Sequence, residues 1–172
     1  MNPIPGKLVE SVFNRVLAAD LTPELKTQLA EAGLDLSGPM QSSYPRPVWY
    51  QAIELTAKTL FAQDPAPTQL RKLGGHIISS LQSRQIIKSS YLTMAKLMGP
   101  RRAIKQAMDF TDRSPIKLTI TERAKTEFDV SVDDTNQPEF LTGLLEQAIT
   151  MLGGKNASVT SQGQGLFRAT WR

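Results

Sequence analysis

The sequence contains no cysteine, and this absence excludes several classes of site. A chain without thiols has no disulfide framework, no thiolate nucleophile and no cysteine-based zinc or iron–sulfur centre. Histidine is almost as scarce, because His76 is the only one among 172 residues. No Gly-x-Ser-x-Gly nucleophile elbow is present either. We therefore interpret the chain as a non-enzymatic protein, and we expect no cofactor and no metal site.

Long apolar runs are also missing. Nothing in the sequence reaches the roughly 18 continuous apolar residues that cross a bilayer. The first residues mix Lys7, Glu10 and Arg15 with an amphipathic pattern, which is not typical of a signal peptide. We expect a soluble cytoplasmic protein that has no membrane partner.

Acidic residues are absent from residues 65–108, although this stretch holds eight of the twenty lysines and arginines. A formal net charge of +4 makes the whole chain moderately basic and favours acidic partners. Six of these cations form the predicted anion- or partner-binding face: Arg84, Lys88, Lys96, Arg101, Arg102 and Lys105. Acidic residues elsewhere in the chain, for example Glu10, Glu31 or Glu54, offer an alternative, in which the face is paired internally.

Apolar residues recur at helical spacing up to about residue 108. The pattern predicts helices near residues 8–17, 22–33, 48–60, 70–81, 87–98 and 100–108. Residues 35–47 are rich in proline and predict an irregular crossing. Gly74 and Gly75 lie inside a predicted helix, so we expect another backbone to approach closely there. Gly99 is expected to end one helix and Pro100 to open the next.

The period changes to two after Ser114-Pro115. The alternation predicts two strands that begin near Ile116 and end near Val132, a helix over 138–152, and a second hairpin around Gly163-Gln164-Gly165. We predict an α+β fold, in which a helical lobe (1–113) precedes a four-stranded antiparallel sheet lobe (114–172). At this length the chain is expected to form a single domain over 1–172.

A small-ligand pocket beneath the proline-rich crossing is a second hypothesis. Its candidate residues are Tyr44, Trp49, His76 and Tyr91. The alternative is that these residues are ordinary core or surface residues, since aromatic residues on amphipathic helices usually pack in the core.

The acidic residues near the first hairpin are Glu127, Asp129, Asp133 and Asp134. They lack the spacing of a calcium-binding loop. We interpret them as a solvated turn and place Asp129 on the solvent face of its strand.

Several short motifs, in their order and spacing, resemble a known family. They are Tyr44-Pro45 followed by Trp49, Leu73-Gly74, Gly99-Pro100-Arg101-Arg102, Phe140 to Gly143, Gly153, and Thr170-Trp171-Arg172. From about Leu8 to Arg172 the chain resembles the large myxobacterial paralogous family catalogued as domain of unknown function 2378. More distantly, the strand-strand-helix-strand-strand ending resembles the ligand-binding fold of haem-nitric-oxide sensors, vinyl-four-reductase-like domains and trafficking-complex subunits. The resemblance implies a sensor or adaptor style of function and, from the wider fold, self-association as a homodimer.

One departure from the haem sensors affects this expectation. Those proteins use an axial histidine and a Tyr-x-Ser-x-Arg porphyrin clamp, whereas this chain has only His76 and no such clamp. We therefore expect no haem. The preferred hypothesis is a regulatory or adaptor module that binds a protein partner or a small ligand, and the alternative is binding of nucleic acid or another anionic polymer through the basic face.

Overall fold

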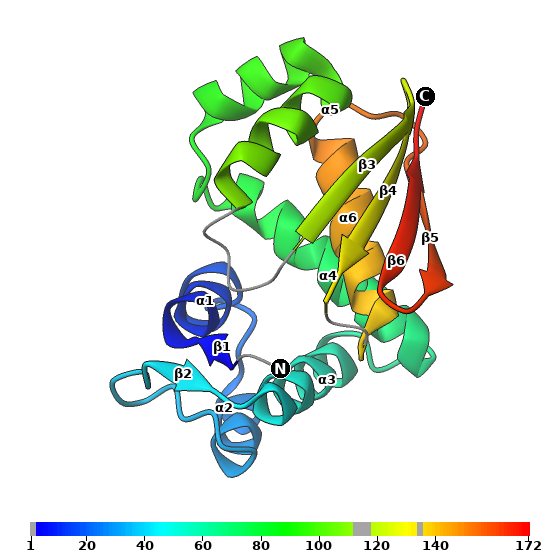
Figure 1. Ribbon diagram of the computed structural model, residues 1–172. Coiled ribbons are helices and arrows are strands. Elements are labelled where there is room, and N and C mark those ends of the chain that lie inside the picture. The colour runs from blue at the N-terminus through cyan, green and yellow to red at the C-terminus, as the bar shows by residue number, and fades with distance from the viewer. Residues whose placement is uncertain (1–2, 112–117, 134–135) are drawn as a thin grey trace.

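The computed structural model describes residues 3–111, 118–133 and 136–172 and shows a mixed α+β fold (Figure 1). Helices dominate up to residue 111, and a four-stranded antiparallel sheet follows, with one helix between its two hairpins. The predicted fold class is confirmed. The expected strand start at Ile116 and the acidic residue Asp134 lie outside the described residues.

The N-terminal elements form a helical layer around a two-residue β-ladder. In chain order they are β1 (Ile4–Pro5), α1 (Gly6–Glu10), the π-helical η1 (Ser11–Val16), α2 (Pro23–Glu31), β2 (Ser43–Tyr44) and α3 (Arg46–Leu60). Thr22 caps α2 through its hydroxyl oxygen, which accepts a hydrogen bond from the Leu25 amide at 3.2 Å. The pairing of β1 with β2 was not predicted, because a ladder this short leaves no alternation in the sequence.

The first predicted helix changes its winding at Ser11. The amide of Leu17 bonds the carbonyl of Val12 at 2.8 Å, five residues back, which is the π-helical pattern. Val12, Phe13 and Val16 are all buried in this segment. Wider turns of this kind occur frequently at functional sites.

Two long helices, α4 (Ala66–Ser83) and α6 (Pro138–Met151), cross in backbone contact. A Cβ atom on Gly74 would overlap the Phe140 carbonyl oxygen, and a Cβ atom on Gly143 would overlap the Arg71 carbonyl oxygen. Both positions therefore require glycine. The predicted close approach at Gly74 is confirmed, and Gly143 is its counterpart on α6.

The helix α5 (Ser89–Thr111) is interrupted at Gly99, which has φ +76° and ψ 163°. This left-handed conformation favours glycine. Figure 1 shows the two halves of α5 as separate helices. The predicted break between Gly99 and Pro100 is confirmed.

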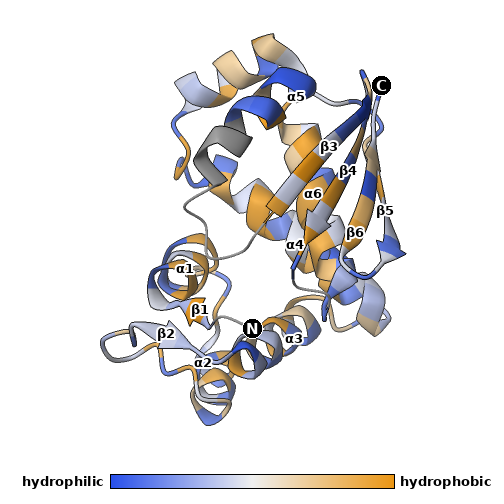
Figure 2. Ribbon diagram, in the orientation of Figure 1, coloured by the Kyte–Doolittle hydropathy of each residue, from blue (hydrophilic) through white to orange (hydrophobic). Residues whose placement is uncertain are grey.

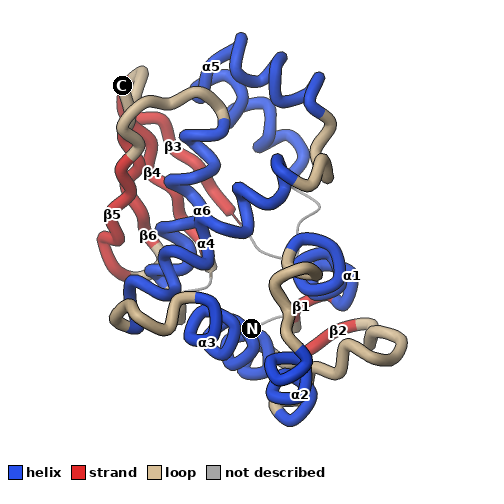
Figure 3. The backbone as a smooth tube through the Cα atoms, turned by 180° about the vertical axis from the view of Figure 1, so that it is seen from behind, coloured by secondary structure: helices blue, strands red, loops and turns tan. Residues whose placement is uncertain are grey.

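The sheet has the strand order β3-β4-β6-β5, with all pairs antiparallel. Its strands are β3 (Leu118–Ala124), β4 (Glu127–Val132), β5 (Ser158–Gly163) and β6 (Leu166–Thr170). Figure 3 shows α4 and α6 crossing on one side of the sheet. Because α6 is covered by α4 on one side and by strands on the other, it carries hydrophobic residues along most of its length (Figure 2).

Two buried clusters make up the core. The first joins η1, α2, α3 and α4 with Phe140 of α6, and the second joins the inner face of the sheet with Ile149. Leu141 packs against both clusters. The helix α6 therefore links the helical layer to the sheet. None of the helices in the described ranges is both long enough and apolar enough to span a membrane.

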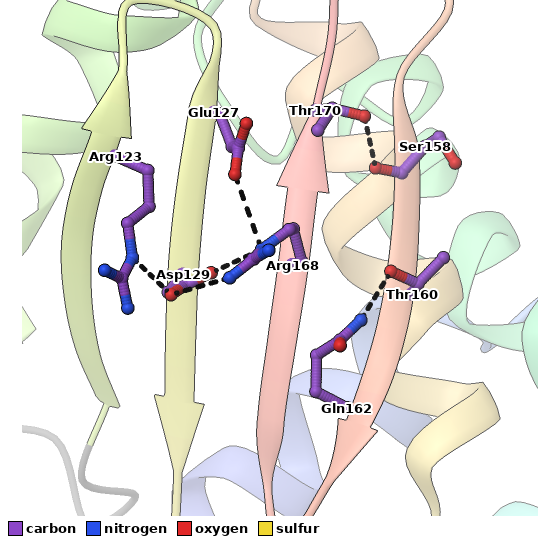
Figure 4. Close-up of polar contacts among 8 residues, drawn as sticks. All are labelled: Arg123, Glu127, Asp129, Ser158, Thr160, Gln162, Arg168 and Thr170. Atoms are coloured by element: carbon purple, nitrogen blue, oxygen red, sulfur yellow. Dashed lines mark hydrogen bonds and ion pairs between the residues drawn. The ribbon is translucent and has the colours of Figure 1, made fainter.

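The outer face of the sheet carries a compact ion cluster centred on Asp129 (Figure 4). Arg123 Nε donates to Asp129 Oδ2 at 2.6 Å, and Arg168 Nε donates to Asp129 Oδ1 at 2.9 Å. Asp129 is only 4% exposed, so the expectation of a solvated Asp129 was wrong. The alternation placed it on the correct face, but the two arginines cover it. The hydrogen bonds from the two arginines lower the pKa of Asp129, and the bond from Arg168 has the larger effect.

The helix crossing gives a first prediction. Gly74→Ala is expected to destabilise the fold by about 2 kcal/mol or more, because overpacking against backbone outweighs the gain in helix propensity. Gly75→Ala is the matched control, since its Cβ would lie 3.8 Å from Gln147 Cβ, an ordinary contact. Denaturant unfolding should show Gly75→Ala as stable as the parent or up to about 1 kcal/mol more stable. Equal stability of the two alanine variants would contradict a backbone-to-backbone crossing.

The ion cluster gives a second prediction, about pH. The lowered pKa of Asp129 means that its stabilising effect is present above the unfolded value of about 3.9 and is lost as pH falls through the folded value. At pH 7, Asp129→Asn should reduce the free energy of unfolding by about 2 kcal/mol. This difference from the parent should shrink as pH falls below about 4. A difference that stays constant from neutral to acid pH in chemical unfolding would argue against the assigned ion pairs.

Candidate ligand pocket

A pocket of about 300 Å³ lies where the N-terminal helices meet α4, α6 and the end of β4. Its described lining consists of Leu8, Ser11, Val12, Val16, Trp49, Tyr50, Ile77, Leu81, Val132, Gln137, Phe140, Leu141 and Leu144. Ten of these thirteen side chains are aliphatic or aromatic, and apart from the indole N–H of Trp49 these ten carry no polar group. Apolar cavities of about 150 Å³ stay dry and bind small apolar molecules, so this volume is sufficient for a ligand.

The pocket wall combines segments that are distant in sequence. The π-helical η1 and the last turn before it supply one side, through Leu8, Ser11, Val12 and Val16. The helices α4 and α6 supply the opposite side. Their glycine crossing holds these two helices together, so it also sets the spacing between Ile77 on α4 and its neighbours on α6.

Gln137 is a polar exception in this wall. Its Nε2 donates to the Tyr50 carbonyl at 3.0 Å and approaches Glu54 Oε1 at 3.4 Å. Because both neighbouring atoms are hydrogen-bond acceptors, the end of the Gln137 side-chain amide that faces them is the NH₂ group. The Gln137 Oε1 atom is buried and has no hydrogen-bond partner within the described part of the chain. A buried acceptor without a partner reduces stability by roughly 1–3 kcal/mol, so a molecule that donates a hydrogen bond to Gln137 Oε1 would remove this penalty.

A second polar cluster joins Asp20, in the turn that follows η1, to α4. Asp20 Oδ2 lies 3.1 Å from His76 Nε2 and accepts from Arg84 Nη2 at 2.8 Å. Ile77 and Leu81 line the pocket and lie between His76 on α4 and Arg84, which directly follows the last residue of α4. The cluster therefore ties the two walls of the pocket together. Ser80 Oγ is 3.5 Å from the same Nε2 of His76, so serine and aspartate share one ring nitrogen, and this is not the arrangement of a catalytic triad.

The structure separates the four predicted pocket residues. Trp49 lines the pocket and packs edge-on against Phe13, with 6.1 Å between ring centroids. Tyr44 is buried in the N-terminal core, where its hydroxyl accepts from the Gln41 amide. The ring Nε2 of His76 contacts the carboxylate of Asp20, and the side chain of Tyr91 on α5 is 69% exposed. Tyr44, Tyr91 and His76 are not part of the described pocket lining.

The six predicted cations fall into two groups. Arg84 pairs with Asp20, while Arg101 and Lys105 both pair with Glu122 on β3. These contacts lower the pKa of Glu122. The hydrogen bond from Lys105 has the largest effect, and the hydrogen bond from Arg101 has the next largest. Among the residues that the structure describes, no ion pair is seen for the remaining three, which are exposed: Lys88, Lys96 and Arg102.

Most pocket residues were not singled out from the sequence. Leu8, Val12 and Val16 lie within the helix predicted near residues 8–17, but periodicity does not separate a helix face that lines a pocket from one that fills a core. Gln137 lies in a polar turn before a helix, and nothing in its neighbourhood marks it as buried. The single available signal was its position directly before Pro138, where a helix begins.

Solved structures with the same fold include several H-NOX proteins. An H-NOX protein from S. oneidensis in the Fe(II) ligation state is 14% identical, with a TM-score of 0.60, and the match covers 98% of this chain and 96% of that chain. An oxygen-binding H-NOX domain related to soluble guanylate cyclases is 12% identical, with a TM-score of 0.59 and coverage of 98% and 95%. An unliganded Fe(II) H-NOX protein from K. algicida gives 12% identity, a TM-score of 0.58 and coverage of 98% and 97%. At these identities the similarity establishes the fold.

The residues around the pocket do not fit a haem group. The described lining contains no histidine or cysteine to bind iron and no arginine to hold propionates. His76, the only histidine, has its Nε2 engaged by Asp20. No group of three or more metal-ligating side chains occurs within the described ranges. The described lining of this pocket therefore differs from a site that binds haem iron through histidine or cysteine.

Family membership follows from the sequence match over the length of the fold. Comparison with curated proteins finds no match. The model of one family, described as "Protein of unknown function (DUF2378)", matches residues 3–172, which include every helix and strand described above. The chain belongs to this DUF2378 family.

Proposed function

We propose that this chain is a small-molecule-binding domain that holds an apolar ligand in the central pocket and acts by binding rather than by catalysis. The observation that carries the proposal is the pocket of about 300 Å³ with almost wholly apolar walls. Ligand sites are typically apolar cavities of roughly this size and larger, with a few placed polar groups. An empty apolar cavity forfeits packing energy, and a ligand restores it.

Gln137 refines the class of ligand. Its unpaired Oε1 would accept a hydrogen bond, so the preferred ligand is an apolar molecule that carries one O–H or N–H donor. The apolar body would contact the π-helical segment, α4 and α6. Such a ligand would bridge the N-terminal helices and the α4–α6 pair, which is how binding would change the relation between them. This arrangement supports a sensor-like, regulatory role.

Nucleic-acid binding, the alternative function, has less support. Arg84, Arg101 and Lys105 are engaged by carboxylates, which reduces the positive charge available to phosphates. Lys88, Lys96 and Arg102 are exposed. Their contribution to any anionic partner is expected to weaken steeply with salt.

A pocket-filling variant tests the proposal. Leu81→Trp places a larger side chain in the pocket wall, and Lys26→Trp, on the exposed face of α2, is the matched control. With 2-methoxynaphthalene as the probe in calorimetric titration, the Leu81→Trp variant should bind at least about tenfold more weakly than the parent, because the cavity is occupied. The Lys26→Trp variant should bind like the parent. Circular dichroism checks that both variants are folded, and equal affinity of all three proteins would rule out this pocket.

The role of Gln137 is tested with a matched pair of probes. The parent should bind 2-naphthol roughly 3- to 10-fold more tightly than 2-methoxynaphthalene, because only 2-naphthol donates a hydrogen bond. Gln137→Met keeps the side-chain length and removes the acceptor. In this variant the two affinities should converge. A preference for 2-naphthol that persists in Gln137→Met would show that another group accepts the bond.

A further inference from the structure

Exposed cations from four segments of the chain gather at the end of the molecule that holds the turn between β3 and β4 (Figure 1). They are Lys96 and Arg102 of α5, Lys125 in the β3–β4 turn, Lys155 in the loop between α6 and β5, and Arg172. Within the part of the chain that the structure describes, no ion pair is seen for any of these five. Their positive charge is therefore available to an anion.

Contacts between the four segments hold these cations in place. The amide of Trp171 donates to the Thr126 carbonyl at 3.1 Å, which sets the β3–β4 turn beside the last residues of the chain. A Cβ atom on Gly153 would lie 3.8 Å from the carbonyl oxygen of Lys96, so α5 packs against the loop that carries Lys155. The fold, rather than the conformation of one flexible segment, brings the charges together.

Lys155 and Arg172 lie directly opposite each other. The Lys155 amide donates to the Arg172 carbonyl at 2.9 Å, and the Arg172 amide donates to the Lys155 carbonyl at 2.7 Å. This reciprocal pattern is that of an antiparallel pair, so both side chains leave the same side of the ladder, with Cβ atoms about 5 Å apart. Like charges in this arrangement repel. Residues 147–172 contain no Asp or Glu that could separate them.

An open hollow of about 420 Å³ adjoins this pair and is lined by Asn156, Thr170, Trp171 and Arg172. Asn156 has φ +51°, a left-handed conformation, and no hydrogen bond of its side chain is seen within the described ranges. Thr170 Oγ1 lies 3.5 Å from the Ser158 carbonyl oxygen, which is long for a hydrogen bond (Figure 4). Guanidinium, amide and hydroxyl groups that can donate hydrogen bonds therefore border one hollow.

We propose that Lys155, Arg172 and the adjoining hollow form a binding site for a phosphate monoester group. Such a group carries a charge of about −1.5 to −2 at pH 7 and three acceptor oxygens, which matches two cations with neutral donors beside them. A carboxylate, with one charge, would balance only one of the two cations. Lys96 and Lys125 on the flanking segments add attraction at longer range. The site shares no residue with the described lining of the ligand pocket, so it does not depend on the proposed function.

A titration of the full chain with phenyl phosphate tests this site. At pH 7 and constant ionic strength, nitrogen-15 NMR should show saturable shifts of the Lys155, Asn156 and Arg172 amides, with a dissociation constant on the order of 1 mM. Methyl phenyl phosphate, a diester with a single charge, should bind at least about fivefold more weakly. Shifts of these amides that do not saturate, or equal affinity for the two esters, would overturn the proposal.

Matched variants separate a site from a general effect of net charge. Lys155→Gln and Arg172→Gln should each weaken phenyl phosphate binding at least about fivefold, because each removes a charge-assisted contact. Lys26→Gln removes the same charge from the exposed face of α2 and should bind like the parent. All three positions are exposed, so all three variants are expected to fold. Equal weakening in all three variants would contradict a built site.

The source of the phosphate group is distinguished with vesicles of phosphatidylcholine that contain phosphatidic acid, whose headgroup is a phosphate monoester. Co-sedimentation of the parent that is lost in Lys155→Gln would assign the site to a lipid headgroup. Binding of phenyl phosphate without co-sedimentation would assign it to a soluble phosphate ester. Either result supports the site, whereas a parent that neither binds phenyl phosphate nor sediments with these vesicles would overturn it.

Discussion

The crossing of α4 and α6 is the contact on which the rest of the structure depends. Gly74 and Gly143 bring two helix backbones together, and neither position has room for a methyl group. The helix α4 belongs to the N-terminal core, while α6 joins that core to the sheet through Leu141. Because the crossing fixes both helices, it also fixes the positions of Ile77 and Leu144 in the pocket wall. The same helix crossing therefore determines both the packing of the fold and the shape of the pocket wall.

The pocket exists because the N-terminal helices meet this crossing without filling the space beside it. The ion pairs of Asp20 with His76 and Arg84 connect the turn after η1 to α4 and its C-terminal end, and Gln137 connects the start of α6 to α3. Polar contacts thus hold the walls, while apolar side chains line the interior. The fold is that of H-NOX domains, and the described lining of the pocket has no histidine or cysteine, while Gln137 Oε1 lacks a hydrogen-bond partner among the described residues. Polar contacts between the walls and apolar side chains in the interior are together the basis for proposing that the pocket binds a small apolar ligand.

Local features of the fold could be predicted from the sequence because their causes are local. The period of apolar residues located the helices and the strands, Gly99-Pro100 located the break in α5, and Gly74 indicated a close helix approach. Contacts between distant segments could not be predicted in the same way. Asp20 is 64 residues from Arg84, and Glu122 lies on a strand opposite Arg101, so the acids that neutralise the basic face were not identified. The pocket was missed for the same reason, since Val12, Ile77 and Leu144 meet only in the folded chain.

The central claim is that the space between η1, α4 and α6 is a ligand site. Intermolecular NOEs between bound 2-methoxynaphthalene and assigned methyl groups test it most directly, because they report proximity rather than affinity. We expect NOEs from the probe to the methyl groups of Val12, Ile77 and Leu144, which lie on three different elements around the pocket. NOEs confined to Met94 and Leu97 on the surface of α5, with none to these three residues, would contradict it.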